Sequence, residues 1–493
     1  MTVEILVDHV YSSLVPPVDD HIVELADTVT SWSDPGAWHT PSYQNYRRKL
    51  RGQPFRGPIW DGRTHLLTTK RLRFPSGLVS RVQKVLWANG YDVFLKDERK
   101  YPESGRSVVP LEGIELRDYQ REAVRVGLAD RCGLFSLPPG TGKTELMIAL
   151  VRSLNVFPVL WLTHERVLLD QTWRRFCSRL ADSSLIIGRA GEGVWEPGDI
   201  TVATVQTMSR RVTGTNGKEF LQSMKVVVSD EVHHEPSGSW YKLLMRCPAP
   251  FRYGCSATPL MRPDGSDLKL IGSIGPVIYT LTPKEAVEKG VLSRPRIMFI
   301  KYNSPPEFER KLLSFPVWTL VYKEAIVYNS ERNGAIVAVC KRSVQEGRRV
   351  LILIRMLAHG RLLEKELARW FGTNQQVSFL QGSSVSVVRK EVVDLFRQGL
   401  VRVIIASSIF DEGIDIPEVD TVIIAAAGKS AIKSIQRIGR GMRVSDSAHG
   451  LEIYDFEDSL HHNLMKHTRE RKRAYRSMDL CKVETITLEE RFT

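Results

Sequence analysis

The sequence is organised around Leu137-Pro-Pro-Gly-Thr-Gly-Lys-Thr144, a glycine-rich stretch that ends in Gly-Lys-Thr. A short apolar run, Cys132 to Leu137, precedes it, and a segment whose apolar residues recur at nearly helical spacing follows it. A strand, a glycine-rich loop and a helix in this order are the context of a phosphate-binding loop. We therefore expect such a loop here, although the first motif position holds Leu137 in place of glycine.

The residue types in this stretch suit a phosphate ligand. Gly140 and Gly142 allow the backbone to curl so that its N–H groups point at phosphate oxygens, and the helix N-terminus adds a favourable dipole. Lys143 can reach the β and γ phosphates, and the Thr144 hydroxyl can bind Mg²⁺. An ordinary Gly-Pro turn before a helix is the alternative. The residues expected to hold a nucleotide here are Pro139, Gly140, Thr141, Gly142, Lys143 and Thr144.

Composition limits the class of protein. A length of 493 residues predicts about three domains, and 42% hydrophobic residues suffice for full cores. No apolar run approaches the ~18 residues of a membrane span, and the first residues lack the basic region of a signal peptide. Six scattered cysteines without a Cys-x-x-Cys pair argue against structural zinc and a disulfide framework. We expect a cytoplasmic protein, in the host cytoplasm if it is viral.

Charge is unevenly distributed near the N-terminus. Residues 1–46 carry seven acidic groups and no Lys or Arg, whereas residues 47–106 carry 15 Lys or Arg and five Asp or Glu. Basic groups neutralise phosphates and aromatic rings stack on bases, so this segment is a candidate DNA-contacting surface. The alternative is a solvated face whose aromatic residues form the core of a small domain. The basic residues concerned are Arg47, Arg48, Lys49, Arg51, Arg56, Arg63, Lys70, Arg71 and Arg73.

Hydrophobic periodicity divides the chain into four parts. Residues 1–110 predict a small α/β module, and residues 459–493 predict a basic C-terminal helix and tail. In residues 111–290 and again in 291–458, apolar strands alternate with amphipathic helices, which predicts two αβα domains with parallel sheets. The chain is therefore expected to fold as two tandem αβα domains preceded by the small module.

Several predicted elements can be compared directly with a structure. In the module we expect strands at Val3–Val7, Leu66–Thr69 and Tyr91–Leu95, and helices at Asp20–Val29 and Ser76–Asn89. In the two domains the expected strands are Gly133–Leu137, Val159–Thr163, Leu185–Ile187, Ile200–Thr204, Lys225–Ser229, Arg252–Ser256, Val350–Ile354, Val377–Leu380, Arg402–Ala406, Thr421–Ala425 and Leu451–Asp455. The expected helices of the second domain are Lys323–Glu346, His359–Phe371, Val387–Gln398 and Ser430–Arg437.

Two carboxylates, Asp230 and Glu231, follow an apolar strand of the first domain. Ligands of open parallel sheets bind at the carboxyl ends of the strands. Asp230 can hold Mg²⁺ against the phosphates, directly or through water, and Glu231 can orient and polarise the attacking water. His233 can link this site to neighbouring segments. We therefore expect Lys143, Asp230 and Glu231 to be catalytic.

Further polar residues are placed to serve the same site. Ser256 and Thr258 follow the next strand, where small hydroxyl groups can bond the carboxylates and shift with nucleotide state. Upstream of the loop, the Gln120 amide can pair with both N6 and N7 of adenine, and Arg117 can stack over the base. An ordinary helix start is the alternative for Arg117 and Gln120.

The second domain contains the arginine-rich run Gln436-Arg-Ile-Gly-Arg440-Gly-Met-Arg443. Arginine suits bidentate phosphate contact, and few acidic residues lie nearby to pair with these side chains. Arg440 and Arg443 can reach across an interdomain cleft to the γ-phosphate, a contact worth ~10³–10⁵ in rate. A basic surface helix is the alternative. Before this run, Gly413 permits a close backbone approach, and Asp415 can accept from a ribose hydroxyl or fix the arginine helix.

In this order, the motifs resemble those of superfamily 2 helicases of the DExH kind, over residues of about 115–455. The resemblance rests on Gln120, Gly142-Lys143-Thr144, Asp230-Glu231-Val232-His233, Ser256-Ala257-Thr258, Gly413–Asp415 and Gln436–Arg443. It implies ATP and Mg²⁺ in a cleft between two RecA-like domains and nucleic acid across both domains. It also implies contacts to one nucleic-acid strand by segments that contain Thr163, Thr204, Gln206, Thr207, Ser407 and Ser408.

The N-terminal module also resembles that of UvsW-type phage recombination helicases. Four short motifs occur in the same order: Trp60-Asp61-Gly62-Arg63, Leu66-Leu67, Pro75-Ser76-Gly77-Leu78-Val79 and Gly90-Tyr91. The unusual Leu137 is familiar in the branch that includes XPB-like and UvsW-like enzymes. The resemblance implies ATP-dependent remodelling of branched DNA, by branch migration, fork regression or unwinding of forks or R-loops, in recombination, replication and repair.

The leading hypothesis is therefore an ATP-driven DNA helicase whose partner is branched, forked or duplex DNA. An RNA helicase is one alternative, because the motifs do not separate a reader of the 2′-hydroxyl from a DNA tracker. A nucleotide-gated binding or strand-annealing protein is another. At the C-terminus, basic side chains either contact phosphates or form a solvated helix. These are Lys466, Arg469, Arg471, Lys472, Arg473 and Arg476.

Overall fold

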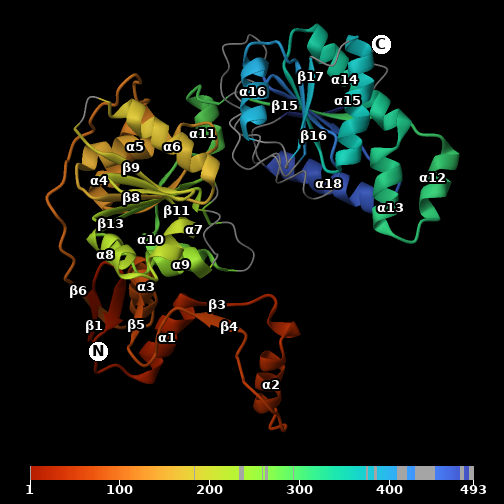
Figure 1. Ribbon diagram of the computed structural model, residues 1–493. Helices are drawn as coiled ribbons and strands as arrows, with labels where there is room; N and C mark the ends of the chain where they lie inside the picture. The colour runs from red at the N-terminus through yellow and green to blue at the C-terminus, as the bar shows by residue number, and fades with distance from the viewer. Residues whose placement is uncertain are drawn as a thin grey trace. The chain divides into compact units, whose positions relative to one another are not determined.

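The computed structural model describes most of the chain, and its residues fall into two compact units (Figure 1). The first comprises Met1–Leu137 and Gly142–Leu281, and the second comprises Pro138–Thr141 and Thr282–Thr493. No helix among the described residues has both the length and the apolar character needed to cross a membrane. The described residues are 2–181, 184–232, 238–257, 259–260, 265–292, 294–372, 376–381, 386–407, 419–427, 450–477 and 482–487.

The first unit begins with a four-stranded sheet in the order β5-β2-β1-β6. Along β1, buried side chains alternate with more exposed ones, and Val3, Ile5 and Val7 belong to one core with the buried faces of α1 and α3. A two-stranded ribbon, β3–β4, leads to α2, which extends away from this sheet (Figure 1). The elements are β1 (Thr2–Val7), β2 (Tyr11–Leu14), α1 (Asp20–Thr30), β3 (Ser31–Ser33), α2 (Pro41–Leu50), β4 (Arg63–His65), β5 (Arg73–Pro75), α3 (Val79–Ala88) and β6 (Asp92–Asp97).

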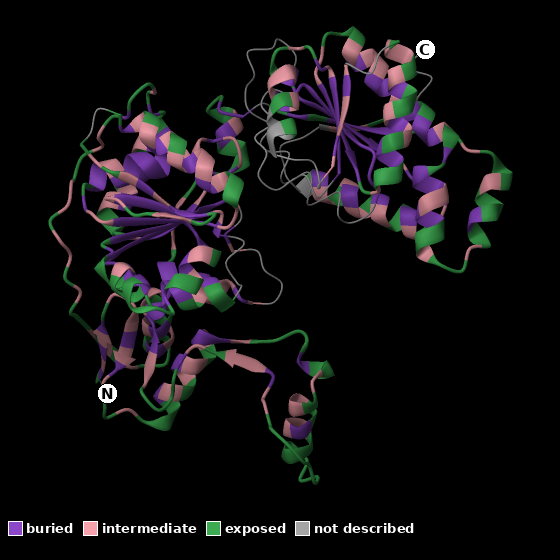
Figure 2. Ribbon diagram, viewed as in Figure 1, coloured by how far each residue is buried: buried purple, intermediate pink, exposed green. Residues whose placement is uncertain are grey.

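An eight-stranded sheet forms the centre of the first unit, in the order β10-β9-β11-β8-β12-β13-β7-β14. All its pairs are parallel except β9–β10, which confirms the predicted parallel αβα fold. Its central strands are buried along their whole length because helices cover both faces (Figures 1 and 2). The strands are β7 (Cys132–Ser136), β8 (Val159–Thr163), β9 (Ile187–Gly191), β10 (Val194–Glu196), β11 (Ile200–Thr204), β12 (Val226–Asp230), β13 (Phe251–Ser256) and β14 (Val277–Thr280).

Helices α4, α5 and α6 lie on one face of this sheet, and α7, α8, α9 and α10 lie on the other (Figure 1). The helices are α4 (Asp118–Asp130), α5 (Lys143–Leu154), α6 (Arg166–Arg179), α7 (Val205–Arg211), α8 (Thr215–Ser223), α9 (Gly238–Leu244) and α10 (Asp267–Ile274).

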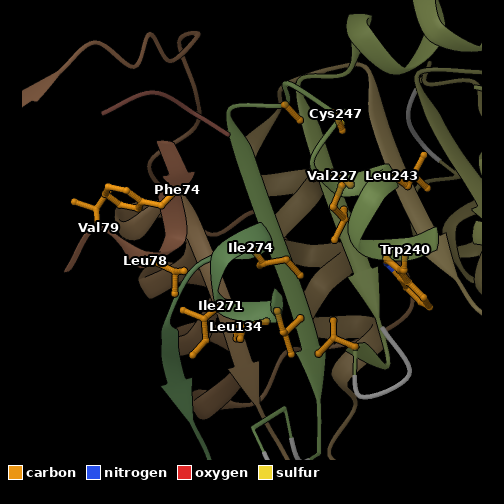
Figure 3. Close-up of a cluster of buried hydrophobic side chains, with 14 of the residues drawn as sticks. Phe74, Leu78, Val79, Leu134, Val227, Trp240, Leu243, Cys247, Ile271 and Ile274 are labelled. Atoms are coloured by element: carbon orange, nitrogen blue, oxygen red, sulfur yellow. The ribbon is translucent and has the colours of Figure 1, made fainter. Parts of the chain in front are cut away.

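The N-terminal sheet has its own strands but shares a hydrophobic core with the larger sheet. Phe74, Leu78 and Val79 of the module belong to the same buried cluster as Leu134 and Ile271, and Figure 3 shows these side chains. Two glycines, Gly77 and Gly272, permit this close packing. A side chain on Gly77 would collide with the carbonyl of Ile271, and one on Gly272 would lie 2.8 Å from Pro75 Cβ. The module therefore packs directly on α10.

The second unit contains a seven-stranded sheet in the order β17-β18-β16-β19-β20-β15-β21, in which every pair is parallel. This confirms the second predicted parallel sheet. Its strands are β15 (Arg296–Lys301), β16 (Val350–Ile354), β17 (Val377–Leu380), β18 (Val403–Ser407), β19 (Thr421–Ile424), β20 (Glu452–Phe456) and β21 (Lys482–Thr487). Its helices are α11 (Pro283–Glu288), α12 (Pro306–Leu313), α13 (Trp318–Tyr322), α14 (Ser330–Gln345), α15 (Leu357–Phe371), α16 (Ser386–Arg397) and α18 (His462–Ser477).

Three predicted elements are wrong. Leu66–Thr69 is not a strand, because the chain turns immediately after it and only Thr68 pairs, in an isolated bridge with Arg73. The strand expected at Leu185–Ile187 lies at Ile187–Gly191, where it forms a hairpin with β10. The single helix expected at Lys323–Glu346 is divided at Tyr328 and Asn329. A π-helical turn precedes the break, and Asn329 caps the start of α14.

A buried ion-pair network links α14, β20 and α18 in the second unit. Arg332 Nε donates to Asp458 Oδ1 at 2.8 Å, and Arg471 Nε donates to Asp455 Oδ2 at 2.9 Å. Arg471 also contacts Asp458 at 3.2 Å, and all four side chains are fully buried. The suggestion that Arg471 contacts phosphates is therefore wrong, because two carboxylates of its own unit already bind it away from solvent.

Candidate nucleotide-binding site

The predicted phosphate loop connects β7 to α5. Gly140 and Gly142 have φ values of 81° and 74°, in the left-handed region that glycine adopts without strain. The loop is braced from within by the Thr141 hydroxyl, which donates to the Pro138 carbonyl at 2.7 Å. Helix α5 begins at Lys143, so its first N–H groups are available to a ligand at the loop. The local backbone therefore has the form that a phosphate requires.

Leu137, the unusual first residue of the motif, is fully buried. Its N–H donates to the Ser256 carbonyl at 3.0 Å. This bond joins the start of the phosphate loop to the end of β13. Strands β7, β13 and β12 are consecutive neighbours in the sheet, so the loop, Ser256 and Asp230 follow one another along its carboxyl edge.

Gln120 lies against the phosphate loop, as its predicted role requires. Its Nε2 donates to the Gly142 carbonyl at 3.3 Å, and its Oε1 accepts from the Arg117 N–H at 2.9 Å. A Cβ on Gly142 would lie 2.7 Å from Gln120 Nε2, so glycine is needed here for space as well as for conformation. Arg117 caps α4, and its side chain is exposed.

The predicted catalytic residues lie close together. Lys143 Nζ is 3.6 Å from Glu231 Oε1, and both side chains are largely buried. Glu231 has φ of 51°, an uncommon value for a residue with a side chain, which marks a sharp turn directly after β12. Asp230, the last residue of β12, is buried, and its Oδ1 accepts from the Glu231 N–H at 2.9 Å.

Cys255 is a site residue that the sequence did not indicate. Its Sγ donates to Asp230 Oδ1 at 3.2 Å from the neighbouring strand β13. Burial, together with the nearby charge of Asp230, raises the pKa of the Cys255 thiol well above its usual value, so the thiol stays protonated and can donate. A cysteine in a buried strand looks like a small apolar core residue, and only the pairing of β12 with β13 shows its role.

The electrostatics of the site suit a divalent cation. Burial, and then repulsion by Glu231, raise the pKa of Asp230 above its usual range, although Lys143 acts in the opposite direction. The positive charge present is therefore too small to stabilise both carboxylates. Carboxylate and hydroxyl oxygens are the ligands that Mg²⁺ prefers, and it also binds substrate phosphates. Asp230, the Thr144 hydroxyl and the loop therefore fit a nucleotide with Mg²⁺.

Four residues expected near a nucleic-acid strand gather at the ends of two adjacent strands. Thr163 and Thr204 are paired neighbours at the ends of β8 and β11, and both are buried. Thr204 caps α7, where its Oγ1 donates to Thr207 Oγ1 at 2.9 Å. Gln206 is exposed, and its Nε2 donates to the His164 carbonyl at 3.0 Å. In the second unit Ser407 ends β18 and is 1% exposed.

The basic residues of the N-terminal module lie in separate places. Arg47, Arg48 and Lys49 form the last turn of α2, and Arg47 packs over the ring of Trp38 at 4.4 Å. Lys70 and Arg71 lie on an exposed turn.

Two other basic side chains of the module make defined contacts. Arg63, in β4, donates to Ser31 Oγ at 2.8 Å, and Arg73 packs over the ring of Tyr11 at 4.1 Å. Of the aromatic residues in this segment, Phe74 is fully buried and belongs to the core. The basic residues of this candidate surface that are exposed to solvent are thus Arg48, Lys49, Arg51, Arg56, Lys70 and Arg71.

Eight predicted site residues lie outside the described residues: His233, Thr258, Ser408, Gly413, Asp415, Gln436, Arg440 and Arg443. The predicted helix Ser430–Arg437 lies there too.

Comparison with known proteins finds two family matches, one in each predicted αβα domain. Residues 113–261 match the family described as type III restriction enzyme, res subunit, and residues 332–445 match the helicase conserved C-terminal domain. Together the two matches take in more than half of the chain, in the order expected for tandem RecA-like domains. The chain is a superfamily 2 helicase. The family resemblance seen in the motifs is thus confirmed.

Relatives of this helicase include archaeal and viral proteins. The DNA 3′-5′ translocase XPB2 of Sulfurisphaera tokodaii is 24% identical over 72% of this chain and 85% of its own length. Helicase 22 of Sulfolobus islandicus filamentous virus is 26% identical over 69% of this chain. The match spans 63% of the length of that viral protein, so the two chains correspond only in part.

Solved structures show the same fold. The helicase domain of Pyrococcus furiosus Hef covers 75% of this helicase and 99% of its own chain, with a TM-score of 0.53 at 17% identity. The crystal structure of T4 UvsW covers 99% of this helicase and 100% of its own chain, with a TM-score of 0.47 at 20% identity. The similarity to Hef supports the RecA-like fold, and the score for UvsW is too low to add to it.

Proposed function

We propose that this protein is an ATP-dependent DNA helicase and translocase that remodels branched DNA. The observation that carries the proposal is the cluster of Lys143, Glu231 and Asp230 at the carboxyl edge of one sheet, with Lys143 Nζ 3.6 Å from Glu231 Oε1. A phosphate loop beside two carboxylates is the set of groups that phosphoryl transfer to water requires.

Each candidate residue of this site has a separate role in the proposed hydrolysis of ATP. Bound Mg²⁺·ATP supplies the phosphoryl group that is transferred to water. The N–H groups from Gly140 to Thr144 and the Lys143 ammonium bind the phosphates, while Asp230 and the Thr144 hydroxyl hold the metal. Glu231 orients and polarises the attacking water. Because Lys143 contacts both this carboxylate and the phosphates, it keeps the two aligned.

Other predicted site residues complete the proposed mechanism. Gln120 and Arg117 bind adenine, and Ser256 couples the loop to β13 through its bond with Leu137. From the second unit, arginines stabilise the charge that develops on the phosphate, an effect worth ~10³–10⁵ in rate. The residues assigned here from the sequence are His233 and Thr258 for coupling, Gly413 and Asp415 for the nucleotide, and Gln436, Arg440 and Arg443 for catalysis.

Support for DNA as the substrate comes from the names of relatives. Translocase XPB2 acts on DNA in the 3′-5′ direction, and Rad25 of Haloarcula marismortui, 26% identical over 82% of this chain, is also named a DNA 3′-5′ helicase. We propose that this protein moves in the same direction. One strand would contact the segments of Thr163, Thr204, Gln206 and Thr207, and Ser407 and Ser408 would contact it in the second unit.

Remodelling of branched DNA is the finer part of the proposal. It is supported by the motif order in the N-terminal module and by the basic end of α2, which projects from that module (Figure 1). Arg48 and Lys49 are exposed there, where they can neutralise the phosphates of a second DNA arm. The module packs on α10 and belongs to the first compact unit, so an arm bound to it would move with that unit.

ATP hydrolysis measured with single-stranded, duplex, forked and four-way DNA, and with a matched RNA, tests the proposal. We expect DNA to stimulate phosphate release, with the largest effect from forked or four-way DNA. Lys143→Ala is the negative control and should abolish stimulation. Equal stimulation by RNA would favour an RNA helicase. An absence of stimulation by every nucleic acid would contradict the proposal.

The role of α2 has its own test. Replacing Arg48 and Lys49 by Ala should weaken duplex binding and lower the salt slope of log K by ~0.9 for each phosphate that is no longer neutralised. Arg81→Ala with Lys84→Ala is the matched control, since both lie exposed on α3 of the same module. An equal decrease in affinity in both double variants would show only a general charge effect.

A further inference from the structure

A cavity of about 580 Å³ lies between the segment that follows β6 and the last turns of α4. One wall is the chain from Arg99 to Arg106, and the other is formed by α4 and Arg131, which follows it. The side chains that matter for its chemistry are Arg99, Tyr101, Glu103, Arg106, Arg125 and Arg131.

The wall formed by residues 99–106 is fixed in place by contacts with the rest of the first unit. The Gly105 N–H donates to the Leu154 carbonyl at 2.9 Å, and any side chain on Gly105 would collide with the Ser153 carbonyl. Near the other end, His9 Nε2 is 3.0 Å from the Lys100 carbonyl, and Tyr101 packs edge-on against Phe251 at 5.4 Å. Hydrogen bonds and packing within the first unit therefore define the shape of the cavity.

Positive charge dominates the lining. Four guanidinium groups face one lining carboxylate, Glu103. Arg99 is paired with Asp97 at 2.6 Å, but no ion pair to Arg106, Arg125 or Arg131 occurs among the described residues. A cluster of arginines whose positive charges are not paired with carboxylates favours an anion with more than one negative charge.

Tyr101 positions one of these arginines. Arg131 has φ of 63°, and this left-handed turn at the end of α4 places its guanidinium 4.4 Å over the Tyr101 ring. Burial raises the pKa of Tyr101 to about 12, so its hydroxyl remains a neutral donor at physiological pH. A planar guanidinium held on a ring keeps its N–H groups directed to the side, where they can contact phosphate oxygens in pairs.

We propose that this cavity is a phosphate-binding site, distinct from the nucleotide site, in which Arg106, Arg125 and Arg131 bind the phosphate groups of a polyanion. Two sources share this chemistry: the backbone of a nucleic-acid arm and a free polyphosphate. Fixed walls with several unpaired guanidinium groups match phosphate better than carboxylate because the charge to be neutralised is larger.

The cavity lies at the opposite edge of the sheet from the phosphate loop and the catalytic carboxylates. Arg131 directly precedes β7, whereas the phosphate loop follows the other end of that strand. Five residues of strand separate the two by roughly 16 Å. Residues Thr163, Thr204 and Asp230 also lie at the carboxyl edge of the sheet, so the cavity is at the opposite edge.

The test uses the full chain with Arg106 and Arg125 both replaced by Ala. Both side chains are exposed and make no ion pair within the described chain, so folding should be retained. Lys218→Ala with Arg246→Ala is the matched control, because both residues are exposed and neither lines the cavity, Lys218 lying on α8 and Arg246 just after α9. One arm measures duplex DNA binding by fluorescence anisotropy over a range of salt. The other measures inorganic pyrophosphate binding by calorimetry in a Lys143→Ala background, which removes the phosphate loop as a competing site.

Each outcome decides the proposal. A loss of duplex affinity of about fivefold or more, with a salt slope smaller by ~0.9–1.8, would identify a nucleic-acid backbone as the source. Loss of one stoichiometric pyrophosphate site, with DNA binding unchanged, would identify a free polyphosphate. No difference from the control variant in either arm would overturn the proposal. Neither arm depends on ATP hydrolysis, so the result is separable from the proposed function.

Discussion

Two aspartates occupy similar places in the two units but have different surroundings. Asp230 ends β12 and Asp455 lies near the end of β20, and both are buried at the carboxyl end of a central parallel strand. Asp455 is bound by Arg471 Nε at 2.9 Å and by the Tyr475 hydroxyl at 3.2 Å. Asp230 accepts from the Glu231 N–H and from the Cys255 thiol, and no Lys or Arg of the described chain forms an ion pair with it.

This difference distinguishes Asp455, a structural carboxylate, from Asp230, which is available to bind a ligand. In the second unit two aspartates face two arginines, and although burial opposes it, Asp455 and Asp458 raise the pKa of Arg471 and hold it charged. In the first unit burial and Glu231 raise the pKa of Asp230. Burial also raises the pKa of Asp455, although Arg471 acts in the opposite direction, so the two aspartates differ in their partners and not in the direction of the shift. A buried carboxylate without its own cation is the better candidate for binding a metal.

The largest expected effect is on catalysis. Glu231→Gln keeps the shape of the side chain but removes the group that polarises water, so ATP hydrolysis should fall by ~10²–10⁴ while ATP still binds. Phosphate release and binding of a fluorescent ATP analogue measure the two effects separately. Glu219→Gln, an exposed carboxylate on α8, is the control. Retained hydrolysis in Glu231→Gln would remove Glu231 from the mechanism.

The next largest effect is on stability. Arg471→Ala leaves Asp455 buried without its partner and should destabilise the second unit by ~3–5 kcal/mol. Urea unfolding monitored by circular dichroism measures the change, and Arg473→Ala on the exposed side of α18 is the control. If the two variants were destabilised equally, the buried network would not be what holds α18 on the second unit.

Replacing each of the two aspartates by Asn tests the difference between them directly. No Lys or Arg of the described chain forms an ion pair with Asp230, and Glu231 repels its charge, so Asp230→Asn should raise the unfolding free energy by about 0.5–2 kcal/mol in the absence of nucleotide. Hydrolysis should be lost in the same variant. Asp455→Asn should instead lower stability, because it weakens the pair with Arg471. Melting temperatures that fall in both variants would contradict the distinction.

The smallest expected effect concerns pH. Burial, with a further contribution from Arg332, lowers the pKa of His359 to about 3, and its Nε2 lies 2.8 Å from Asn333 Oδ1. Between this value and the unfolded pKa of about 6.5, only the unfolded chain binds the proton, so stability is lost as pH falls. From pH 7 to pH 6 the loss should be about 0.7 kcal/mol. Denaturant unfolding of wild type and His359→Gln is measured at each pH, and the difference between their unfolding free energies gives the contribution of His359. If that difference did not change with pH, the predicted effect of His359 would be refuted.

Much of the fold could be predicted because its central strands are apolar on both faces. Val159–Thr163, Ile200–Thr204 and Val350–Ile354 match the structure to the residue for this reason. The edge strand β21 was missed because only two residues of its sequence, Lys-Val-Glu-Thr-Ile-Thr, are apolar. Such a strand is defined by its pairing with β15, which is distant in sequence.

The site was only partly predictable for a related reason. Lys143, Asp230 and Glu231 lie in motifs with fixed local spacing, and the structure brings them together. Cys255 was missed because its role depends on the pairing of two strands. Arg471 was misassigned because its partners lie on β20 and just beyond it, 13 and 16 residues away in the chain. Local motifs identify the chemistry, whereas long-range contacts decide which charges are already paired.

Strand displacement from a synthetic four-way DNA junction tests the central claim most directly. Wild type and Glu231→Gln are compared with ATP and without it, by native gel electrophoresis of labelled strands. The proposed mechanism predicts product only for wild type with ATP. Equal product from Glu231→Gln, or product formed without ATP, would contradict it and favour an annealing or nucleotide-gated binding protein.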